Sequence, residues 1–361
     1  MIIKKVDYII VGQGLAGSCL ALCLLSKGKS IMVFDRPEQN RSSAIAAGLF
    51  NPITGKLMSK TWQAALIFPE LDLFYRNAEQ ILGQRFYYPQ PLYRPFLSVE
   101  EQNAWMGKSS EATLVACISK RYIHKVYLPI RLIIPGVALC LVSVVNVDVP
   151  KFMKTISDYL AKRNSIVFEQ FDELLIHNSN EGIRYKDFES TKIIYCTGTE
   201  ALNSMTGMDL PITKLKGETL TIEMDEDPEL IYNRGVYIVP YKEKQYRVGA
   251  TYETKNLSGE ITAEARMELD QKLMELIKIP YRITAQDWNF RPTTPDRRPI
   301  LGFKSDSKNV VIFNGLGTKG VSLAPYFSAQ LCDWLIGVGK IQPEVNITRF
   351  KSLSSKSSVV V

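Results

Sequence analysis

The chain has 361 residues, of which 46% are hydrophobic and 22% are charged, and its formal net charge at pH 7 is +7. This is an ordinary composition for a soluble enzyme. The length predicts two connected domains, because single hydrophobic cores rarely exceed roughly 250 to 300 residues. The positive charge is modest, so a solvated basic surface is favoured over a nucleic-acid or membrane surface.

Residue counts argue against several kinds of site. With two histidines in the chain, a multi-histidine metal site is not expected, and we predict no metal. The six cysteines include no C-x-x-C pair and mostly lie in apolar stretches, which predicts reduced core residues in a cytoplasmic protein.

No targeting or integral membrane segment is expected. The first apolar run is too short for a signal peptide and continues directly into a glycine-rich turn. The apolar stretch 132–149 contains Pro135, Gly136, Asn146 and Asp148, and it is shorter than the roughly 20 apolar residues that span a membrane. Two buried strands are predicted there instead.

The N-terminal stretch is predicted to form a strand, a turn, a helix and a second strand. Residues 6–11 are typical of a parallel strand covered on both faces. Gly12, Gly14 and Gly17 then fit G-x-G-x-x-G, which permits a tight turn, the approach of a pyrophosphate and close packing of helix on strand. Apolar residues recur at helical spacing from there to Gly28, a residue type that often ends a helix.

A second strand over residues 30–34 leads to Asp35, whose carboxylate can accept hydrogen bonds from ribose hydroxyls. An acidic residue at this place favours a dinucleotide-binding unit over a glycine turn without a ligand. The cofactor contacts predicted in this unit are Gly12, Gly14, Leu15, Ala16, Gly17, Asp35 and Arg36.

Small side chains crowd together in residues 42–52, where the backbone could lie flat against a large group. A planar ring system is one candidate for that group, and a tightly packed helix start is the alternative. The cofactor contacts predicted here are Ser43, Ala46, Ala47 and Gly48.

The middle of the chain has no second nucleotide signature before residue 192. Residues 63–83 have helical periodicity, whereas residues 86–146 mix aromatic, proline and strand-like runs that suggest an inserted substrate domain. A helix from 147 to 160 precedes further strands. The apolar run 192–196 ends in a small-residue turn, as expected of another parallel strand beside the dinucleotide, and Thr197 and Gly198 in that turn are predicted cofactor contacts.

The C-terminal half returns to strand patterns. Alternating residues between 206 and 289 predict an antiparallel sheet with one face toward a cavity. A later strand, glycine-rich turn and helix repeat the logic of the N-terminus and direct another helix N-terminus at an anionic group. The cofactor contacts predicted in this turn are Gly315, Gly317, Thr318, Lys319 and Gly320.

Taken together, these stretches resemble the D-amino-acid oxidase superfamily of FAD-dependent amine oxidoreductases, most closely its glycine-oxidase-like branch. The resemblance covers nearly the whole chain, and several motifs in the family's order are far more specific than any one. The motifs are the N-terminal unit, residues 43–48, 237–240, 247–251, 291–296 and 299–302, and the glycine turn around Gly317 and Gly320.

The resemblance implies an α/β fold with two interleaved domains. One is a Rossmann-type FAD-binding domain with a doubly wound, mostly parallel sheet, formed by residues 1–75, 145–205 and 290–361. The other is an α+β substrate-binding domain built on an antiparallel sheet, formed by residues 76–144 and 206–289.

FAD is the implied cofactor, bound without a covalent link. Relatives that bind flavin covalently carry a cysteine just before the segment that holds Arg291, and no cysteine lies between Cys196 and Cys332 here. Lys319 and the helix N-terminus beside it could stabilise anionic reduced flavin. A solvent-facing lysine is the alternative reading of Lys319.

Three residues are implied to act on the substrate. Arg291 would bind the substrate carboxylate through its permanently charged planar fork, and a solvated arginine is the alternative. Tyr237 matches the family tyrosine that helps to hold that carboxylate, and Tyr232 stands near a second one. Simple packing is the alternative for both tyrosines, because the chain contains 17 of them.

The implied function is oxidation of a small amino acid or N-substituted glycine to an imine, which is then hydrolysed. Oxygen or a quinone would accept the electrons. Oxidative removal of a carboxymethyl group from a tRNA wobble-uridine amine is a second reading, although no basic stripe with interleaved aromatics stands out. A flavin-holding binding protein without turnover is a third.

Overall fold

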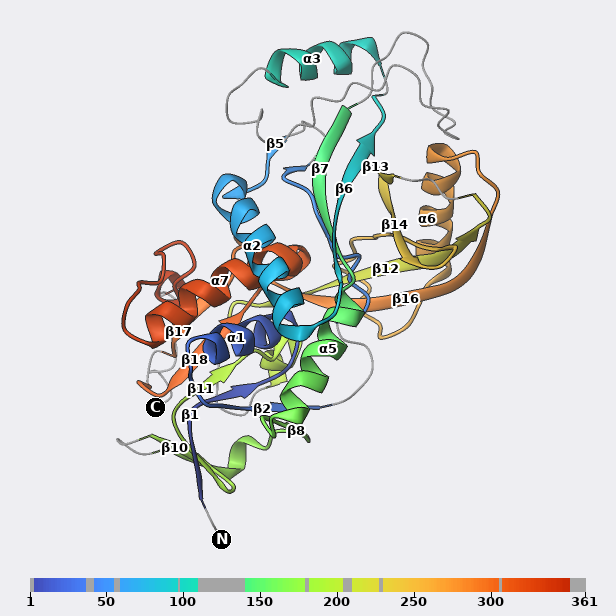
Figure 1. The fold of residues 1–361 in the computed structure, drawn as a ribbon. Coiled ribbons are helices and arrows are strands. Elements are labelled where there is room, and N and C mark those ends of the chain that lie inside the picture. Colours follow the sequence, from blue (N-terminus) through green and yellow to red (C-terminus); the bar gives the residue numbers. More distant parts are fainter. Residues whose placement is uncertain are drawn as a thin grey trace, which may run out of the picture.

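The computed structural model describes residues 3–36, 42–54, 59–96, 98–109, 140–178, 182–203, 210–226, 230–304 and 307–350. Two large β-sheets with surrounding helices form the fold (Figure 1). Residues 132–139, where the first of two buried strands is predicted, lie outside the described residues; the second of these strands is present as β7.

The first sheet is mostly parallel and includes the N-terminal unit. Its strands lie in the order β17-β18-β11-β1-β2-β8, with β17 antiparallel at one edge. Their bounds are β1 Lys4–Val11, β2 Ile31–Asp35, β8 Ile166–Phe168, β11 Phe188–Tyr195, β17 Ile300–Phe303 and β18 Val310–Asn314. The prediction of a further parallel strand beside the dinucleotide turn is confirmed, because β11 pairs with β1.

Four helices and one face of this sheet contribute to a single core cluster. They are α1 Leu15–Ser26, α2 Ala64–Leu82, α5 Val149–Lys162 and α7 Gly320–Leu335. The predicted boundaries have local causes. Helix α1 is followed by Gly28 at φ +73°, and Asp148 caps α5 by accepting a hydrogen bond from Lys151 N at 3.0 Å.

The opposite face of the sheet is covered differently. Its buried cluster contains side chains of the hairpin formed by β9 Ile176–Asn178 and β10 Ile183–Tyr185, together with those of irregular segments, and no residue of a described α-helix belongs to it. The edge-on contact between Phe34 and Tyr185, with ring centroids 4.9 Å apart, is typical of this layer. The hairpin itself belongs to the first sheet, because β10 pairs with β11, and its side chains Ile183 and Tyr185 contribute to this cluster.

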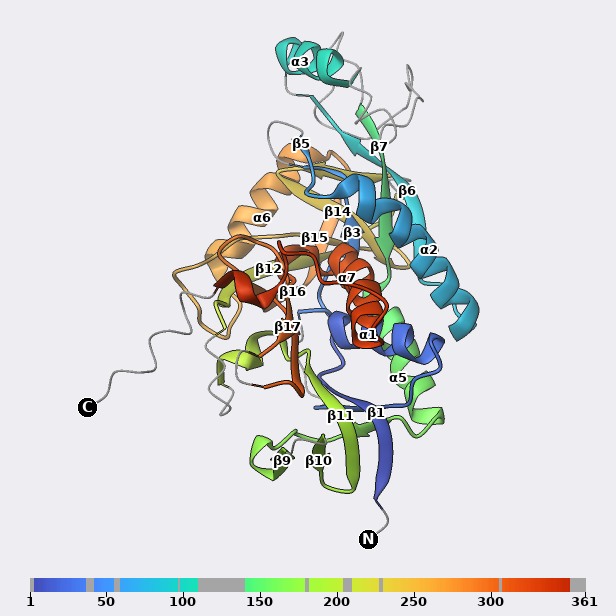
Figure 2. The same ribbon diagram turned by 90° about the vertical axis from the view of Figure 1, so that its left-hand side faces the viewer.

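The second sheet is mostly antiparallel, as predicted, and lies above the first in both views (Figures 1 and 2). Its strand order is β16-β12-β15-β14-β13-β6-β7-β3. The bounds are β3 Leu49–Phe50, β6 Tyr87–Arg94, β7 Cys140–Val147, β12 Thr213–Met224, β13 Ile231–Arg234, β14 Val236–Lys242, β15 Gln245–Gly249 and β16 Tyr281–Thr293.

The two faces of the second sheet have different neighbours. Helix α6 Ala263–Leu276 covers one face and buries alternate residues of β12 and β15. The other face packs partly against Ala47, which comes from the segment between β2 and β3. The parallel sheet and the antiparallel sheet therefore meet through the segment around residue 47.

Several short elements complete the described chain. They are α3 Val99–Ser109, β4 Ile53–Thr54, β5 Ser59–Lys60, β9 Ile176–Asn178, β10 Ile183–Tyr185, η1 Glu173–Leu175, η2 Gly198–Asn203 and η3 Gly317–Lys319. We keep the interleaved domain division as a proposal with two changes. Strand β3 belongs to the second sheet although it lies within residues 1–75, and β16 continues past residue 290 to Thr293.

Within the described ranges, no helix has both the length and the apolar character that crossing a membrane requires. The cysteines whose side chains are described, Cys19, Cys23, Cys196 and Cys332, are free thiols, and burial raises the pKa of each. They are therefore neutral core groups.

Candidate active site

The three glycines of the N-terminal turn have different physical roles. An added Cβ at Gly12, whose φ is +94°, would lie 2.7 Å from Cys196 O, and one at Gly17 would lie 1.9 Å from Gly12 O. A Cβ at Gly14 would meet nothing closer than Ser43 Oγ at 3.7 Å. The protein's own packing requires Gly12 and Gly17, whereas Gly14 leaves space for a ligand at the backbone.

Helix α1 begins at this open position. Gly14 is its N-cap and offers no side-chain cap, and the first turn contains no acidic residue. Ser43 Oγ accepts a hydrogen bond from Leu15 N at 3.2 Å. A helix N-terminus with uncompensated partial positive charge suits a phosphate, so these residues fit the pyrophosphate of FAD.

Asp35 ends β2 and is 8% exposed. Its Oδ1 accepts a hydrogen bond from Gln13 N at 2.9 Å, so the carboxylate supports the glycine turn directly. Contact with the FAD ribose stays a proposal. Arg36 is exposed and directs its guanidinium toward Gln170 and Glu200, with Nη1 3.1 Å from Gln170 Oε1.

Replacing Asp35 with alanine is expected to weaken FAD binding by roughly 1 to 3 kcal/mol, because a charge-assisted hydrogen bond is lost. Asp7→Ala is the matched control, since Asp7 bonds Ser30 on the same two strands but at their other end. Titration of the apoproteins with FAD measures both. Equal affinities in the Asp35 variant and wild type would remove Asp35 from the site.

The small-residue segment lies between α1 and the second sheet. Residues 42–45 form a turn and not a helix start. Gly48 has φ +72°, and a Cβ there would lie 1.8 Å from Val147 O, so crossing β7 requires this glycine. Arg247 Nη1 donates to the carbonyls of Ala44 and Ala46, both at 3.3 Å, and ties the segment to the sheet.

The turn after β11 contains an unusual polar atom. Thr197 Oγ1 is buried and has no hydrogen-bond partner among the described residues. The neighbouring Gly198, at φ +57°, accepts a hydrogen bond at its carbonyl from Asn314 Nδ2 at 2.9 Å. A buried hydroxyl without a partner is costly, so Thr197 fits a site that a bound cofactor completes.

The second glycine-rich turn lies beside the first. A Cβ at Gly320 would lie 3.2 Å from Leu15 Cδ1, which brings the start of α7 close to the start of α1. Gly315 has φ +73°, and its Cβ would lie 2.7 Å from Thr294 Cγ2. The two predicted anion-binding turns therefore occupy one region of the fold.

Lys319 ends the short helix η3 and is partly buried, whereas its neighbour Thr318 is exposed. Burial lowers the pKa of Lys319, and the charge of Arg297 lowers it further. Gly317, at φ +55°, lies near Thr293. A cation held in this turn is available to a negative group, but its role toward reduced flavin remains a proposal.

Arg291 lies on the face of the second sheet that is turned away from α6. Its guanidinium lies directly over Gly217, where a Cβ would lie 2.1 Å from Nη2. Nη1 donates to Thr251 O at 3.2 Å, and Cζ is 5.1 Å from the ring centroid of Tyr252. The guanidinium is thus held between a bare stretch of backbone and an aromatic ring.

Tyr237 lies on the same face, on β14, and strands β12 and β15 lie between it and β16, which carries Arg291. It is paired with Gly249 across β14 and β15, and its hydroxyl lies 2.5 Å from the place of a Gly249 Cβ. Gly249 pairs in turn with Thr219 on β12, two residues from Gly217. Arg291 and Tyr237 therefore extend toward the same short length of β12.

Burial raises the pKa of the Tyr237 hydroxyl to about 12, although the charges of Arg291 and Arg247 act to lower it. The phenol therefore stays protonated at neutral pH and can donate a hydrogen bond. A neutral donor beside a fixed cation suits a carboxylate ligand.

Tyr232 does not join this pair, and the expectation that it acts on the substrate has to be corrected. It pairs with Ile238 and therefore lies on the opposite face from Tyr237. It is completely buried in the cluster under α6, with its ring centroid 5.5 Å from that of Tyr93. We exclude it from the proposed site.

Sequence reasoning missed Gly217 and Gly249 as site positions and assigned no role to Thr251 and Tyr252. A signal was present for the two glycines. Each interrupts an alternating strand, and a glycine in a strand often marks the close approach of another group.

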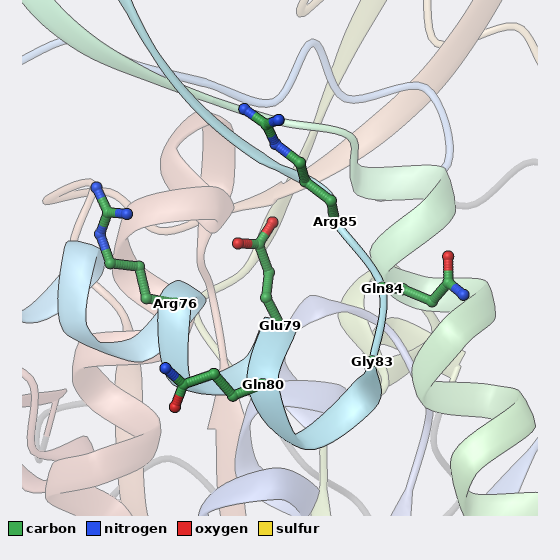
Figure 3. Close-up of a pocket in the computed structure, with 6 residues that line it drawn as sticks. All are labelled: Arg76, Glu79, Gln80, Gly83, Gln84 and Arg85. Atoms are coloured by element: carbon green, nitrogen blue, oxygen red, sulfur yellow. The ribbon is translucent and has the colours of Figure 1, made fainter.

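A separate pocket lies at the C-terminal end of α2 (Figure 3). Its lining residues are Arg76, Glu79, Gln80, Gly83, Gln84 and Arg85. None of them is a predicted site residue. Glu79 Oε1 accepts hydrogen bonds from Phe86 N and Tyr87 N at 2.7 and 2.8 Å, so its carboxylate holds the turn after the helix.

No group of three or more histidine, cysteine or acidic residues that could hold a metal occurs in the described part of the chain.

Comparison with known proteins identifies a family over most of the chain. The DAO family, described as "FAD dependent oxidoreductase", matches residues 7–334. A solved structure of glycine oxidase from Geobacillus kaustophilus shares the fold with a TM-score of 0.75 at 16% identity, covering 96% of this chain and 99% of that one.

Curated relatives are similar over the same extent. The bifunctional protein ThiO/ThiG of Nostoc sp. (strain PCC 7120) is 26% identical over 91% of this chain. Glycine oxidase of Pseudomonas putida (strain KT2440) is 23% identical, with 93% of this chain and 96% of that protein covered. The tRNA 5-methylaminomethyl-2-thiouridine biosynthesis bifunctional protein MnmC of Idiomarina loihiensis is 22% identical over 96% of this chain. The chain spans 52% of the ThiO/ThiG protein and 59% of the MnmC protein.

Proposed function

Since this chain belongs to the DAO family of FAD-dependent oxidoreductases, we propose that it oxidises the C–N bond of a small amino acid or N-substituted glycine. The product is an imine, which water hydrolyses to a keto acid or an aldehyde. The observation that supports this best is the approach of two side chains to neighbouring strands, Arg291 over Gly217 of β12 and Tyr237 over Gly249 of β15, which pairs with Thr219 of β12.

Arg291 binds the substrate carboxylate in this proposal. Its position over backbone, with Nη1 bonded to Thr251 O, fixes the plane of the guanidinium before a ligand arrives. A planar cation of fixed orientation holds a carboxylate by two parallel hydrogen bonds and so sets the direction of the Cα–H bond. The same residue therefore serves both affinity and reaction geometry.

FAD supplies the hydride acceptor, and the chain supplies its binding groups. The N-termini of α1 and α7, with Ser43 and Thr197, are the proposed contacts, and Gly14 leaves the backbone accessible. Lys319 and the start of α7 offer positive charge where negative charge develops on reduction.

FAD should be bound without a covalent link. No cysteine lies between Cys196 and Cys332, and both of these are buried. Acid precipitation of the purified protein is expected to release the yellow flavin into the supernatant. A flavin that stays with the pellet would contradict noncovalent binding.

Tyr237→Phe is expected to lower kcat/KM for carboxylate amines by roughly 0.5 to 1.5 kcal/mol, because one neutral donor is removed from the carboxylate. Steady-state rates with a carboxylate amine measure this change. Tyr241→Phe is the matched control, because Tyr241 lies four residues further along β14, with its ring centroid 4.2 Å from Cζ of Arg247. Equal losses in both variants would count against a specific role for Tyr237.

Product analysis tests the proposed reaction class. The holoenzyme is incubated with glycine derivatives, D-amino acids and L-proline, in air and separately with a quinone. Formation of a keto acid or aldehyde together with released ammonia or amine, or of the cyclic imine from L-proline, supports the proposal, and the productive condition identifies the electron acceptor. A flavin that no amine reduces would instead favour a binding protein.

The similarity to MnmC supports one second candidate, oxidative removal of a carboxymethyl group from an amine on tRNA. The net charge of +7 is compatible with this reading. Binding of tRNA that weakens steeply with salt, together with flavin reduction by carboxymethylated tRNA and not by free amino acids, would favour it.

A further inference from the structure

The segment 251–262 connects β15 to α6 and contributes two of the contacts that hold Arg291. The Thr251 carbonyl accepts from Arg291 Nη1, and the Tyr252 ring lies beside the guanidinium. Tyr252 is 69% exposed, so its own packing does not fix its position. Whatever orients this segment therefore also orients Arg291.

A buried ion pair on β12, the strand over which Arg291 lies, contacts this segment. Lys216 Nζ is 3.2 Å from Glu218 Oε1, and the two side chains are 1% and 3% exposed. These residues flank Gly217, and alternation along β12 directs them to the face opposite Arg291. The pair is thus close to the proposed substrate site without being part of it.

The ion pair binds the segment at its middle and its far end. Glu218 Oε1 accepts from Thr262 Oγ1 at 2.8 Å, and Oε2 accepts from Thr262 N at 2.9 Å. Gln286 Nε2 donates to Oε2 at 2.7 Å and to Thr262 O at 2.8 Å. Lys216 Nζ reaches Ser258 Oγ at 3.4 Å.

The near end of the segment is held by the backbone of the same two residues. Thr251 Oγ1 accepts from Glu218 N at 2.9 Å, and Thr251 N donates to Glu218 O at 3.1 Å. Lys216 and Glu253 exchange two backbone hydrogen bonds of 2.9 Å. Thr251 therefore connects Glu218 to Arg291, because its hydroxyl accepts from Glu218 N and its carbonyl accepts from Arg291 Nη1.

A contribution to stability alone explains this arrangement poorly. Replacing a buried ion pair with apolar side chains of similar size is often neutral or even stabilising, because removing two charges from water is costly. Such a pair does, however, impose one geometry, since each charge accepts only a few partner positions. This favours a role in orientation.

We propose that Lys216 and Glu218 anchor the segment 251–262 so that Thr251 and Tyr252 hold Arg291 in its carboxylate-binding orientation. Glu218, Lys216 and Thr251 are positioning residues and touch no substrate. The inference rests on the proposed function, because it concerns the affinity of Arg291 for a carboxylate.

The experiment compares four variants of the holoenzyme. Thr251→Val removes the hydroxyl that accepts a hydrogen bond from Glu218 N, whereas Thr251→Ser keeps a hydroxyl at that position. Glu218→Gln breaks the ion pair. Glu223→Gln is the matched control, because Glu223 pairs with the exposed Arg282 at the other end of β12.

Binding of acetate, which cannot be oxidised, is measured from the change it causes in the flavin spectrum, and thermal unfolding is recorded for every variant. Thr251→Val and Glu218→Gln are expected to weaken acetate binding by about tenfold, the range for a group left without its partner. Reduction of the flavin by a carboxyl-free amine should change by less than about twofold. Thr251→Ser and Glu223→Gln should match wild type.

A variant that unfolds more easily but binds acetate as tightly as wild type would overturn the proposal, since a purely structural anchor behaves in that way. If Glu218→Gln does not fold, the Thr251 pair decides the question. If acetate does not bind near the flavin even in wild type, the proposed carboxylate site itself fails, and that result is distinct from the failure of the anchor.

Discussion

Replacing Arg291 with leucine is expected to lower kcat/KM for carboxylate amines by roughly 2 to 5 kcal/mol while FAD stays bound. A carboxylate that leaves water needs a fixed opposite charge, and the fork of Arg291 also orients the Cα–H bond. The guanidinium lies over Gly217 in the second sheet and is not one of the proposed FAD contacts. Steady-state kinetics and the flavin content of the purified variant measure the two effects.

Arg291→Lys is the informative companion to this variant. A lysine restores the charge without the planar fork, so it is expected to resemble the leucine variant more than wild type. The Arg291 assignment is wrong if the leucine variant oxidises carboxylate amines at the wild-type rate. It is also wrong if that variant still favours them over the matching carboxyl-free amines as strongly as wild type does.

Gly14→Ala is expected to abolish most FAD binding without unfolding the protein. A methyl group at this position meets no described atom closer than 3.7 Å, so the apoprotein should lose no more than about 1 kcal/mol, the cost of alanine at an N-cap. The same methyl group would occupy the space that a pyrophosphate needs. The loss should be at least about 3 kcal/mol, or roughly two orders of magnitude in Kd for FAD.

Gly17→Ala should behave in the opposite way. Its Cβ would lie 1.9 Å from Gly12 O, so the glycine turn has to move and the apoprotein itself should lose stability. Thermal unfolding of the apoproteins and titration with FAD separate the two variants. Normal FAD binding by the folded Gly14 variant would contradict a pyrophosphate at this turn.

Local patterns in the sequence were sufficient to predict most of the fold. The strand, turn and helix of the N-terminal unit depend on neighbouring residues, as do the helix that begins near residue 149 and the end of α1 before Gly28, and all are present. The parallel sheet and the antiparallel sheet are confirmed as well. These features follow from periodicity and turn chemistry, which short stretches of sequence fully contain.

Features set by pairing between distant segments could not be predicted. Tyr232 and Tyr237 looked equivalent as strand tyrosines, but the register of the β13–β14 hairpin places them on opposite faces. Small side chains around Gly48 suggested a ring-binding segment, which stays a prediction, but the sequence did not show that Gly48 also lies against the backbone of Val147 in β7. In both cases the deciding neighbour lies on another strand.

The segments that cover the parallel sheet on the face opposite the helices could not be predicted either. The Rossmann-type, mostly parallel sheet that the resemblance implied is present, but the sequence did not reveal that side chains of the β9–β10 hairpin line its face opposite the helices. The apolar residues of β1 and β2 are buried on both faces in either arrangement. Burial along a strand does not reveal whether a helix or a hairpin covers it.

Anaerobic mixing of the holoenzyme with matched amines tests the central claim most directly. N-methylglycine and dimethylamine differ only in the carboxylate that Arg291 is proposed to bind, and further glycine derivatives, D-amino acids and L-proline extend the comparison. We expect the yellow flavin to bleach with at least one carboxylate amine and at least about 100-fold more slowly with its carboxyl-free counterpart, the ratio that corresponds to roughly 3 kcal/mol. Equal bleaching by both members of every pair, or no bleaching by any amine, would contradict the account.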